Sequence, residues 1–402
     1  MKIGIYLEGS PEMGGGFFQS LKASLLLLDI KKYTKEIELI ITKEETKEYL
    51  LQKKIKNKLF SLNRISNYLS QLFEINSFND LLNKFKINHP FYNFIKNNKY
   101  DLIIFLGPSQ MSKFCKDVGF ISNIWDLDHK KNSQFPEHNL SNIYENKEKL
   151  FKEIITRAFK IIVPHKSNKN DLIKFYGASD DKISIQNFIP MLPTIYKEKL
   201  DIVKYAEIYL KFELPNNKKI IFYPAQFWAH KNHKYIIDVA EILKSKKDDK
   251  YLFVFCGGSK GNSAYIKELI LKNQLEDYIK IFNFLSDDEV ISLYKNCNAV
   301  VMPTFCGPTN LPIYESFFFK KIIFYTKNLI PDDPINNHLI PIDISSPKDL
   351  YAKLEICFDK EKLEKIVTDN YEYYKLICNE DDFKKNYEKI LDEFTYLVNR
   401  WK

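Results

Sequence analysis

The chain has 402 residues, of which 45% are hydrophobic and 28% are charged, and its formal net charge is +8. This length suits two domains, and the composition is that of an ordinary soluble globular protein. No apolar run could span a bilayer, and the start lacks the pattern of a signal peptide. The six cysteines form no CxxC pair, so the spacing indicates no zinc or redox motif and predicts reduced thiols in a cytoplasmic protein.

Short apolar segments in the first half predict β-strands, because they are rich in β-branched and aromatic residues. The glycine run at residues 14–16 opens the first predicted helix, and residues 167–177 predict another. The predicted strands are residues 2–9, 36–42, 100–107, 121–125, 159–164 and 182–188.

Residues 46–97 differ from this pattern. Apolar residues recur there at roughly helical spacing between Leu51 and Phe73, with lysines and Arg64 among them. A basic amphipathic helix can lie on an anionic membrane, or it can pack on its own domain with a solvated basic face. We therefore predict a helical, basic insertion, and peripheral membrane contact is one of its two candidate roles.

The second half alternates strands and helices more clearly. Ser286, followed by three acidic residues, marks one helix start. Such alternation implies right-handed βαβ units and a parallel sheet. We predict an α/β fold of two facing doubly wound Rossmann-like domains, residues 1–200 and 216–375, with a cleft between them and a final helix over 376–402. The strands expected in this half are residues 218–224, 250–258, 280–284, 298–303 and 321–326.

The glycines before the first helix are candidates for phosphate contact. Ligands of doubly wound sheets bind beyond the carboxyl ends of the strands, and Gly15 and Gly16 follow the first strand. Glycines allow close approach to free N–H groups, although glycine runs also simply make turns. GSPEMGGG lacks the GxGxxG spacing and FCGGSKGNS is not GxxxxGK[ST], which argues against a dehydrogenase and a P-loop NTPase.

Asp126, Asp128 and His129 lie within the first five residues of the segment WDLDHKKNSQFPE, residues 125–137. His129, close to Asp126 and Asp128, could act as a general base or a hydrogen-bond partner. The same residues would also suit a polar loop without a catalytic role. A metal site would need more ligands at fixed spacing, and none is predicted.

FYPAQFWAHKNH and FCGPTNLPIYESF, residues 222–233 and 305–317, carry the groups expected of a nucleotide site. Lys231 offers a point charge for a diphosphate. Pro312 suits the first turn of a helix, whose free N–H groups form an anion site. Glu315, one turn further on, could accept two hydrogen bonds from a ribose. Together these features predict binding of a nucleotide diphosphate.

At these residues the chain resembles retaining glycosyltransferases of the family 4 type, which are group 1 enzymes with the two-domain GT-B architecture. The resemblance covers most of the chain, and its segments occur in the family's order. It implies an acceptor-binding first domain, a second domain that binds the nucleotide sugar, and a last helix that crosses back onto the first domain. The segments are GGG, WDLDHKKNSQFPE, YPAQFWAHKNH, FCGGSKGN, FLSDDEVISLYKNCNAVVMP and GPTNLPIYESF.

The resemblance implies roles for individual residues. Lys231 would bind the donor diphosphate and Glu315 the ribose, and catalytic roles would pass to Asp126, His129 and Lys231. The residues assigned to donor binding are Gly15, Gly16, Gln226, Lys231, Pro308, Thr309, Asn310, Leu311 and Glu315.

Three positions depart from the family pattern. Gly307 stands where the family usually has the first of two glutamates, a residue that contacts the donor sugar. Gln226 replaces a frequent arginine, and Trp125 replaces a frequent histidine. The identity of the sugar is therefore not implied.

The expected reaction is transfer of a hexose or deoxyhexose, mannose- or rhamnose-like, from a UDP- or GDP-linked donor to a hydroxyl of a glycan or lipid-linked glycan. The resemblance implies bacterial surface polysaccharide synthesis, such as that of lipopolysaccharide, O-antigen or capsule. We expect no metal or other cofactor, and a location in the cytoplasm or on the inner face of its membrane.

Two alternatives keep the fold and change the function. One is a nucleotide-sugar epimerase. The other is a non-catalytic protein that binds nucleotides or glycans, which is motivated by Gly307. Nucleic-acid binding would rest only on net charge, and we do not expect it.

Overall fold

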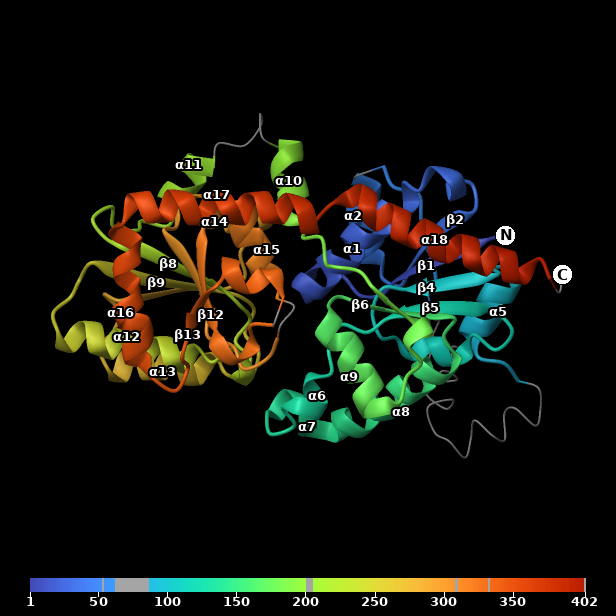
Figure 1. Cartoon of the computed structure of the whole chain (residues 1–402), viewed down its shortest axis with the longest axis horizontal. Helices are drawn as coiled ribbons and strands as arrows, with labels where there is room; N and C mark the ends of the chain where they lie inside the picture. The colour runs from blue at the N-terminus through green and yellow to red at the C-terminus, as the bar shows by residue number, and fades with distance from the viewer. Residues whose placement is uncertain (53, 62–86, 200–204, 308–309, 332, 401–402) are drawn as a thin grey trace. The chain divides into compact units, whose positions relative to one another are not determined.

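The computed structural model describes residues 1–52, 54–61, 87–199, 205–307, 310–331 and 333–400. The chain folds into two compact units, and each is composed of several segments of the sequence (Figure 1). The first unit comprises Met1–Leu127, Glu145–Ile189 and Asn379–Lys402, and the second comprises Asp128–Tyr144 and Pro190–Cys378.

The first unit contains a seven-stranded sheet with the order β3-β2-β1-β4-β5-β6-β7, and every neighbouring pair is parallel. Central strands such as β1 and β4 are buried along their whole length, as expected for a sheet that is covered on both faces. The strands are β1 (Ile3–Leu7), β2 (Ile37–Ile41), β3 (Lys58–Leu59), β4 (Leu102–Phe105), β5 (Gly119–Asn123), β6 (Lys160–Val163) and β7 (Ile183–Ile185).

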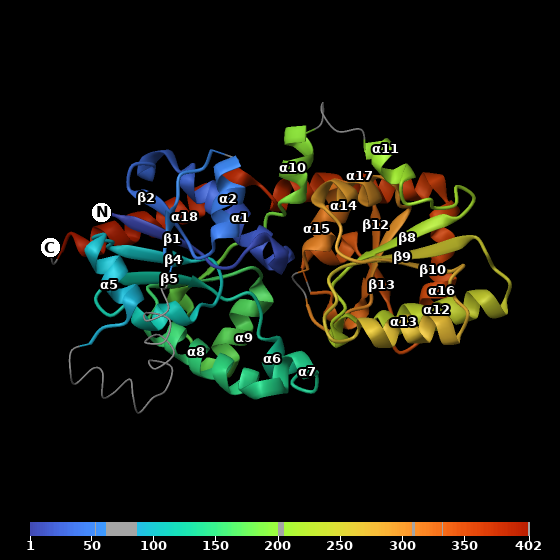
Figure 2. The same ribbon diagram turned by 180° about the vertical axis from the view of Figure 1, so that it is seen from behind.

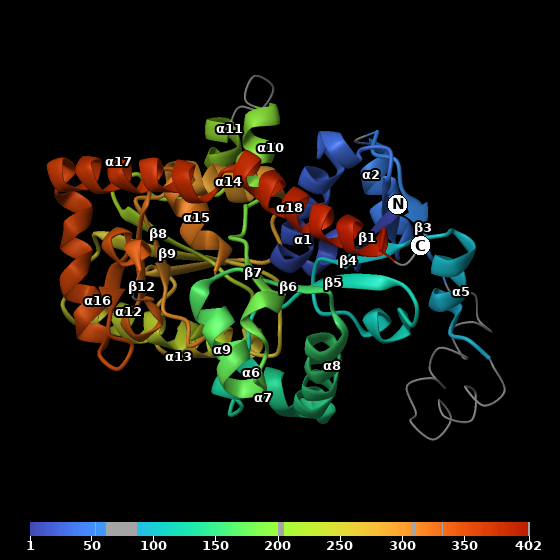
Figure 3. The same ribbon diagram turned by 45° about the vertical axis from the view of Figure 1, so that its right-hand side comes forward.

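Helices cover both faces of this sheet. Apolar residues of α5, α8 and α9 join one core with Tyr6, Phe105 and Ile161 of the strands. Helices α1 and α18 lie together on the opposite face (Figure 3). The helices of the unit are α1 (Gly15–Leu28), α2 (Glu44–Gln52), α5 (Pro90–Asn97), α8 (Ile143–Arg157), α9 (Lys166–Tyr176) and α18 (Glu380–Val398).

The second unit contains a six-stranded parallel sheet with the order β10-β9-β8-β11-β12-β13. Helices α12, α13 and α16 lie on one side of the sheet, and α14, α15 and α17 lie on the other (Figure 2). The strands are β8 (Lys219–Pro224), β9 (Tyr251–Cys256), β10 (Ile279–Phe282), β11 (Ala299–Met302), β12 (Ile322–Thr326) and β13 (Ile340–Ile342).

Two helices of the second unit, α6 and α7, lie far before its first strand in the sequence. Short helices α6 and α7 belong to the segment Asp128–Tyr144, which packs with this unit although it lies between segments of the first. The helices are α6 (Asp128–Lys131), α7 (Pro136–Asn139), α10 (Leu192–Lys199), α11 (Tyr205–Leu210), α12 (His233–Ser245), α13 (Ser263–Lys272), α14 (Asp287–Asn296), α15 (Leu311–Phe318), α16 (Pro347–Lys353) and α17 (Lys360–Ile377).

The strand orders confirm the prediction of two doubly wound Rossmann-like sheets. In both, the chain starts near the middle, moves to one edge, and returns to build the other half. The order therefore reverses between β1 and β4 in the first unit and between β8 and β11 in the second. Ligands of such sheets bind where the order reverses, beyond the carboxyl ends of the strands.

The predicted helical insertion at residues 46–97 is helical only in part. Helix α2 ends at Gln52, Lys54 adopts a left-handed φ of 57°, and β3 follows at Lys58–Leu59. The helical pattern that starts at Leu51 therefore does not continue as one helix. Residues 53 and 62–86, where most of that pattern falls, lie outside the described residues.

The last helix packs on the first unit. Lys22 of α1 is buried and its Nζ lies 2.7 Å from Oε1 of Glu380 at the start of α18. The ring of Phe394 on the same helix contacts the ring of Phe159, with 5.1 Å between centroids. Contacts along its length thus attach α18 to segments of the first unit that lie more than 200 residues earlier in the sequence.

Two further expectations from the sequence concern membrane-spanning helices and the state of the cysteines. Among the residues that it describes, no helix combines the length and apolar character needed to cross a membrane. All six cysteines are free and buried.

Candidate functional site

The loops after β8 and β11 meet at the point where the strand order of the second unit reverses. The backbone N–H of Phe305 donates to the carbonyl of His230 at 2.8 Å, and the hydroxyl of Thr304 donates to the same carbonyl at 3.2 Å. The side chain of Asn232 donates to the carbonyl of Pro303 at 3.0 Å. Three hydrogen bonds therefore hold the two loops together.

Lys231 extends from the first of these loops to the second. Its ammonium donates to Oδ1 of Asn310 at 3.1 Å, and its carbonyl accepts from the hydroxyl of Tyr223 at 2.5 Å. The amide of Asn310 donates in turn to the carbonyl of Cys306 at 3.1 Å and to the hydroxyl of Tyr325 at 2.9 Å. The structure thus brings together two of the residues predicted for donor binding.

Asn310 also precedes α15 as its N-cap residue. Its side chain makes no capping bond to the helix, and Pro312 lies in the first turn as predicted. The first N–H groups of a helix have no partner within the helix and favour an anion. Leu311 begins the helix, whereas Pro308 and Thr309 lie outside the described residues.

Glu315 lies on the buried side of α15, where the hydroxyl of Tyr294 donates to its Oε2 at 2.6 Å. Burial raises the pKa of Glu315 to about 7, although the bond from Tyr294 acts in the opposite direction. Tyr294 is fully buried on α14, between the rings of Phe222 and Phe319. Its place is therefore rigid, and it orients the carboxylate.

A second cation lies over the ring of Trp228, whose indole N–H donates to the predicted residue Gln226. Oε1 of Gln226 accepts from Nε1 of Trp228 at 2.9 Å, and the ammonium of Lys260 lies 5.8 Å from the centre of the Trp228 ring. A Cβ at Gly258 would lie 3.9 Å from Nε2 of Gln226. Lys260 therefore places positive charge over a ring that is hydrogen-bonded to Gln226, the position where the family frequently has an arginine. Lys260 was not among the predicted site residues, and its place in a glycine-rich loop after β9 was the available signal.

In the first unit, Gly16 lies against the indole of Trp125. A Cβ at Gly16 would lie 3.1 Å from that ring, and one at Gly107 would lie 2.9 Å from it. The indole N–H donates to the carbonyl of Leu106 at 2.9 Å, which fixes the ring. Gly16 thus makes room for a tryptophan, and Gly15 begins α1 with an exposed backbone.

The structure places the two candidate catalytic residues of the first half in different units. Asp126 follows Trp125 in the first unit and is partly buried. His129 belongs to α6 of the second unit, where it is completely buried and its ring lies 5.5 Å from that of Tyr144. Their catalytic roles remain predictions.

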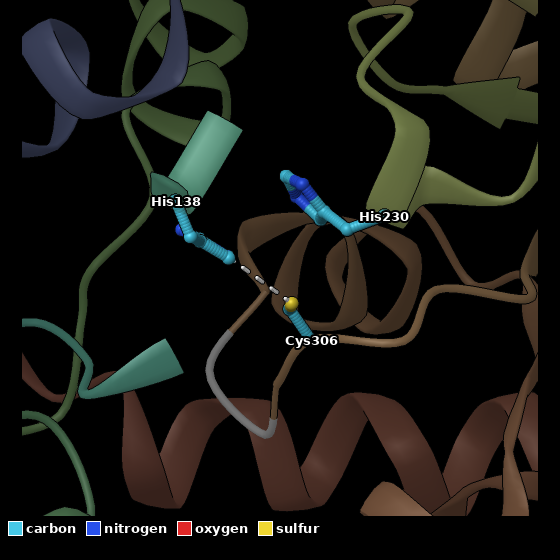
Figure 4. A group of neighbouring side chains, drawn as sticks. All are labelled: His138, His230 and Cys306. Atoms are coloured by element: carbon cyan, nitrogen blue, oxygen red, sulfur yellow. Dashed lines mark hydrogen bonds between the residues drawn. The ribbon is translucent and has the colours of Figure 1, made fainter. Parts of the chain in front are cut away.

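A cluster of polar side chains close to Lys231 was not predicted from the sequence. His230, His138 and Cys306 converge in the second unit (Figure 4). Nδ1 of His230 donates to the carboxylate of Glu137. Burial and the charge of Lys231 lower the pKa of His230, although the hydrogen bond and charge of Glu137 act in the opposite direction. These residues are far apart in the sequence, so no local motif indicated the cluster.

In comparison with known proteins, a family model matches part of the chain. Residues 206–372 match the model of the family described as glycosyl transferases group 1. This segment contains Lys231, Asn310 and Glu315, and the match supports the group 1 part of the resemblance. No curated protein matches the chain.

Solved structures support the fold. A glycosyltransferase from Rickettsia africae superposes with a TM-score of 0.70 at 17% identity, covering 98% of this chain and 99% of the other. Anabaena HepE in complex with UDP and glucose has a TM-score of 0.70 at 15% identity, covering 98% and 100%. UDP-GlcNAc 2-epimerase from Neisseria meningitidis has a TM-score of 0.61 at 14% identity, covering 98% and 100%. At these identities the likeness establishes the architecture alone.

Proposed function

We propose that the protein is a retaining glycosyltransferase that transfers a hexose or deoxyhexose from a nucleotide diphosphate sugar. The acceptor is a hydroxyl of a glycan or lipid-linked glycan in bacterial surface polysaccharide synthesis. The group 1 match over residues 206–372 supports the enzyme class. The retaining outcome, the family 4 assignment and the pathway rest on the resemblance of the motifs.

The observation that carries the proposal is the contact between Lys231 and Asn310 at the reversal of strand order, with Nζ 3.1 Å from Oδ1. An ammonium has three N–H donors, so the same group can hold Asn310 and contact phosphate oxygens. The N–H groups at the start of α15 lie beside it. Lys231 and the N–H groups at the start of α15 would together neutralise the charge of a diphosphate without a metal ion.

Glu315 would bind the ribose of the nucleotide. Its Oε2 accepts from Tyr294, and a carboxylate has several acceptor sites for further hydroxyl donors. Gly15 and Gly16 of the first unit would lie beside the donor phosphates when the substrate is bound. That last role follows from the resemblance.

The proposed chemistry is a front-face displacement. The acceptor oxygen forms a bond to the anomeric carbon while the bond from that carbon to the diphosphate oxygen breaks. The acceptor proton passes to the leaving phosphate, whose charge Lys231 and backbone N–H groups stabilise. Asp126 and His129 remain candidate catalytic residues. We propose UDP as the first nucleotide to test, because the HepE structure contains UDP and glucose, with GDP as the alternative.

A thermal-shift experiment tests the nucleotide site. The full chain is heated with UDP, GDP or ADP and with their sugars, because a ligand that binds only the folded state raises the melting temperature. We expect one nucleotide to raise it, and Lys231→Ala to abolish the rise. Lys234→Ala, which removes a lysine paired with Asp238 one turn along the chain, is the matched control and should keep the shift. An unchanged shift in Lys231→Ala would refute the assigned role.

The epimerase remains a second candidate because the structural neighbour from Neisseria meningitidis has this architecture. Incubating the donor without an acceptor distinguishes the two enzymes, since only an epimerase converts the donor into its isomer. A transferase consumes the donor when a glycan acceptor is added. Nucleotide binding without turnover across donors and acceptors would instead indicate the non-catalytic alternative.

A further inference from the structure

Three side chains with metal-binding atoms converge in the second unit. His138 comes from α7, His230 from the loop after β8, and Cys306 from the loop after β11. One ligand atom of each lies within 4.8 Å of the others, and Nε2 of His138 is 3.8 Å from Sγ of Cys306 (Figure 4). The exposed fractions are 4% for Cys306, 7% for His138 and 13% for the side chain of His230.

We propose that this cluster binds a zinc ion. Two imidazoles and one thiolate form a ligand set that suits Zn²⁺, and three protein ligands leave a fourth position for water. With Zn–N and Zn–S bonds of about 2.0 to 2.3 Å, tetrahedral ligand atoms lie about 3.3 to 3.6 Å apart. The pair formed by His138 and Cys306 is close to this spacing. The most widely separated pair would need to approach by about 1 Å, which small side-chain rotations allow.

A carboxylate that orients one imidazole is the second observation in favour of the site. Glu137 accepts from Nδ1 of His230 and, at 2.8 Å, from the backbone N–H of the same residue. The proton on Nδ1 leaves the lone pair of the imidazole on Nε2. Histidines that bind metals usually donate their other N–H to a carboxylate or carbonyl in this way.

The loops that present the ligands are fixed by their own hydrogen bonds. The backbone N–H of Cys306 donates to the hydroxyl oxygen of Thr304 at 3.2 Å, and Phe305 donates to the carbonyl of His230. His230 and Cys306 are thus held in place before any ion binds. A zinc ion would then join the segment Asp128–Tyr144 to both loops.

This role goes beyond the proposed transfer reaction. The ion would connect three elements of the second unit, and Lys231 follows one of its ligands directly in the chain. It would therefore stabilise the loop that presents Lys231 without contacting the donor. Zinc binding does not require the nucleotide. A negative result in the metal-binding experiment would therefore leave the proposed nucleotide site untouched, and a negative thermal-shift result would leave the zinc site untouched.

The experiment uses the full chain after removal of metal ions with a chelator. Co²⁺, which takes the same ligands as Zn²⁺, is added, and the near-ultraviolet absorption is recorded. We expect one equivalent to produce a thiolate-to-cobalt charge-transfer band, and Zn²⁺ to displace it and raise the melting temperature. Absence of saturable binding, or a cobalt spectrum without a thiolate band, would overturn the proposal. Either result would mean that Cys306 and His138 form a thiol–imidazole hydrogen bond and not a metal site.

Variants assign the band to its ligands. Cys306→Ser should abolish it, and Cys357→Ser, at another buried cysteine of the same unit, should keep it. Glu137→Gln acts on a positioning residue and should weaken zinc binding about 10- to 100-fold with the band retained. Equal zinc affinity in the wild type and in Cys306→Ser would reject the site. If Cys306→Ser does not fold, the spectrum of the wild type still decides.

Discussion

Tyr325 fills the space that a side chain at position 307 would need. A Cβ built on Gly307 would lie 2.3 Å from the hydroxyl of Tyr325 and 3.2 Å from Leu329. That hydroxyl accepts a hydrogen bond from Asn310, so it cannot move without losing this contact. The departure from the family pattern at position 307 therefore has a steric reason.

We predict that Gly307→Ala destabilises the protein by about 1 to 3 kcal/mol, since overpacking costs that much. The cost should be smaller in the Tyr325→Phe background, because the clashing oxygen is absent. Denaturant unfolding of the two single variants and the double variant measures this coupling. Gly258→Ala, where the nearest atom to a new Cβ is at 3.9 Å, is the control and should cost less. Purely additive effects of the two substitutions would contradict the explanation.

The pKa of Glu315 makes stability and ligand binding depend on pH in opposite directions. Burial raises it from 4.5 to about 7, so between these values the folded state keeps a proton that the unfolded state has lost. The stabilising contribution is therefore complete below about pH 4.5, falls as the pH rises, and is lost above about pH 7. Hydroxyl donors of a ribose prefer the ionised carboxylate, so nucleotide affinity should rise over the same range.

We predict that the difference in unfolding free energy between the wild type and Glu315→Gln changes with pH. From about pH 5 to pH 8 the wild type should lose up to about 3 kcal/mol relative to the variant, because each pKa unit corresponds to about 1.4 kcal/mol. Urea unfolding at several pH values measures it. Glu361→Gln, at the exposed start of α17, serves as the control. A difference independent of pH would show that the pKa is not raised.

At the scale of elements, local signals in the sequence were sufficient where the stabilising contacts are local. Ser286 was predicted to start a helix, and it forms a capping box with Glu289 at the start of α14. Pro312 was placed in the first turn of α15 for a similar reason. The contacts of Lys231 with Asn310 and of His230 with Glu137 join residues distant in sequence. No spacing rule could predict those pairs.

The start of α12 depends on a left-handed residue that also joins two loops. Asn232 has φ 56° and ψ 43°, and its side chain donates to the carbonyl of Pro303. Asn232→Gly should cost about 1 kcal/mol through the lost hydrogen bond, and Asn232→Ala about 1 kcal/mol more because alanine disfavours this conformation. Urea unfolding of both variants tests this. Equal costs would mean that the backbone conformation contributes nothing.

At the scale of the whole molecule, alternation of strands and helices predicted both doubly wound sheets. It could not predict that Asp128–Tyr144 would pack with the second unit. That segment has short helices and a polar composition, and its placement depends on side chains such as Glu137 and His138 meeting distant partners. Hydrophobic periodicity predicts which face of a helix or strand is buried, but it does not predict which of the two units that face packs against.

Phe394 connects the end of the chain to the first sheet. It is 6% exposed, and its ring lies 2.6 Å from where a Cβ of Gly119 would be. Phe394→Ala should destabilise the first unit by about 3 to 5 kcal/mol. Hydrogen exchange should show faster exchange in β5 and β6, with the second unit unchanged. Tyr396→Ala, on the same helix with 59% exposure, should leave exchange unaltered, and loss of protection throughout both units would contradict the prediction.

The return of α18 to the first unit affects the order in which the protein matures on the ribosome. Residues 379–402 are translated after the whole second unit, yet they complete the first unit, which also contains residues 1–127. Nascent chains generally fold domain by domain from the amino terminus. The first unit therefore cannot be completed, and the surface of α1 stays uncovered, until the entire second unit has been translated. The sheet of the second unit can form before that point.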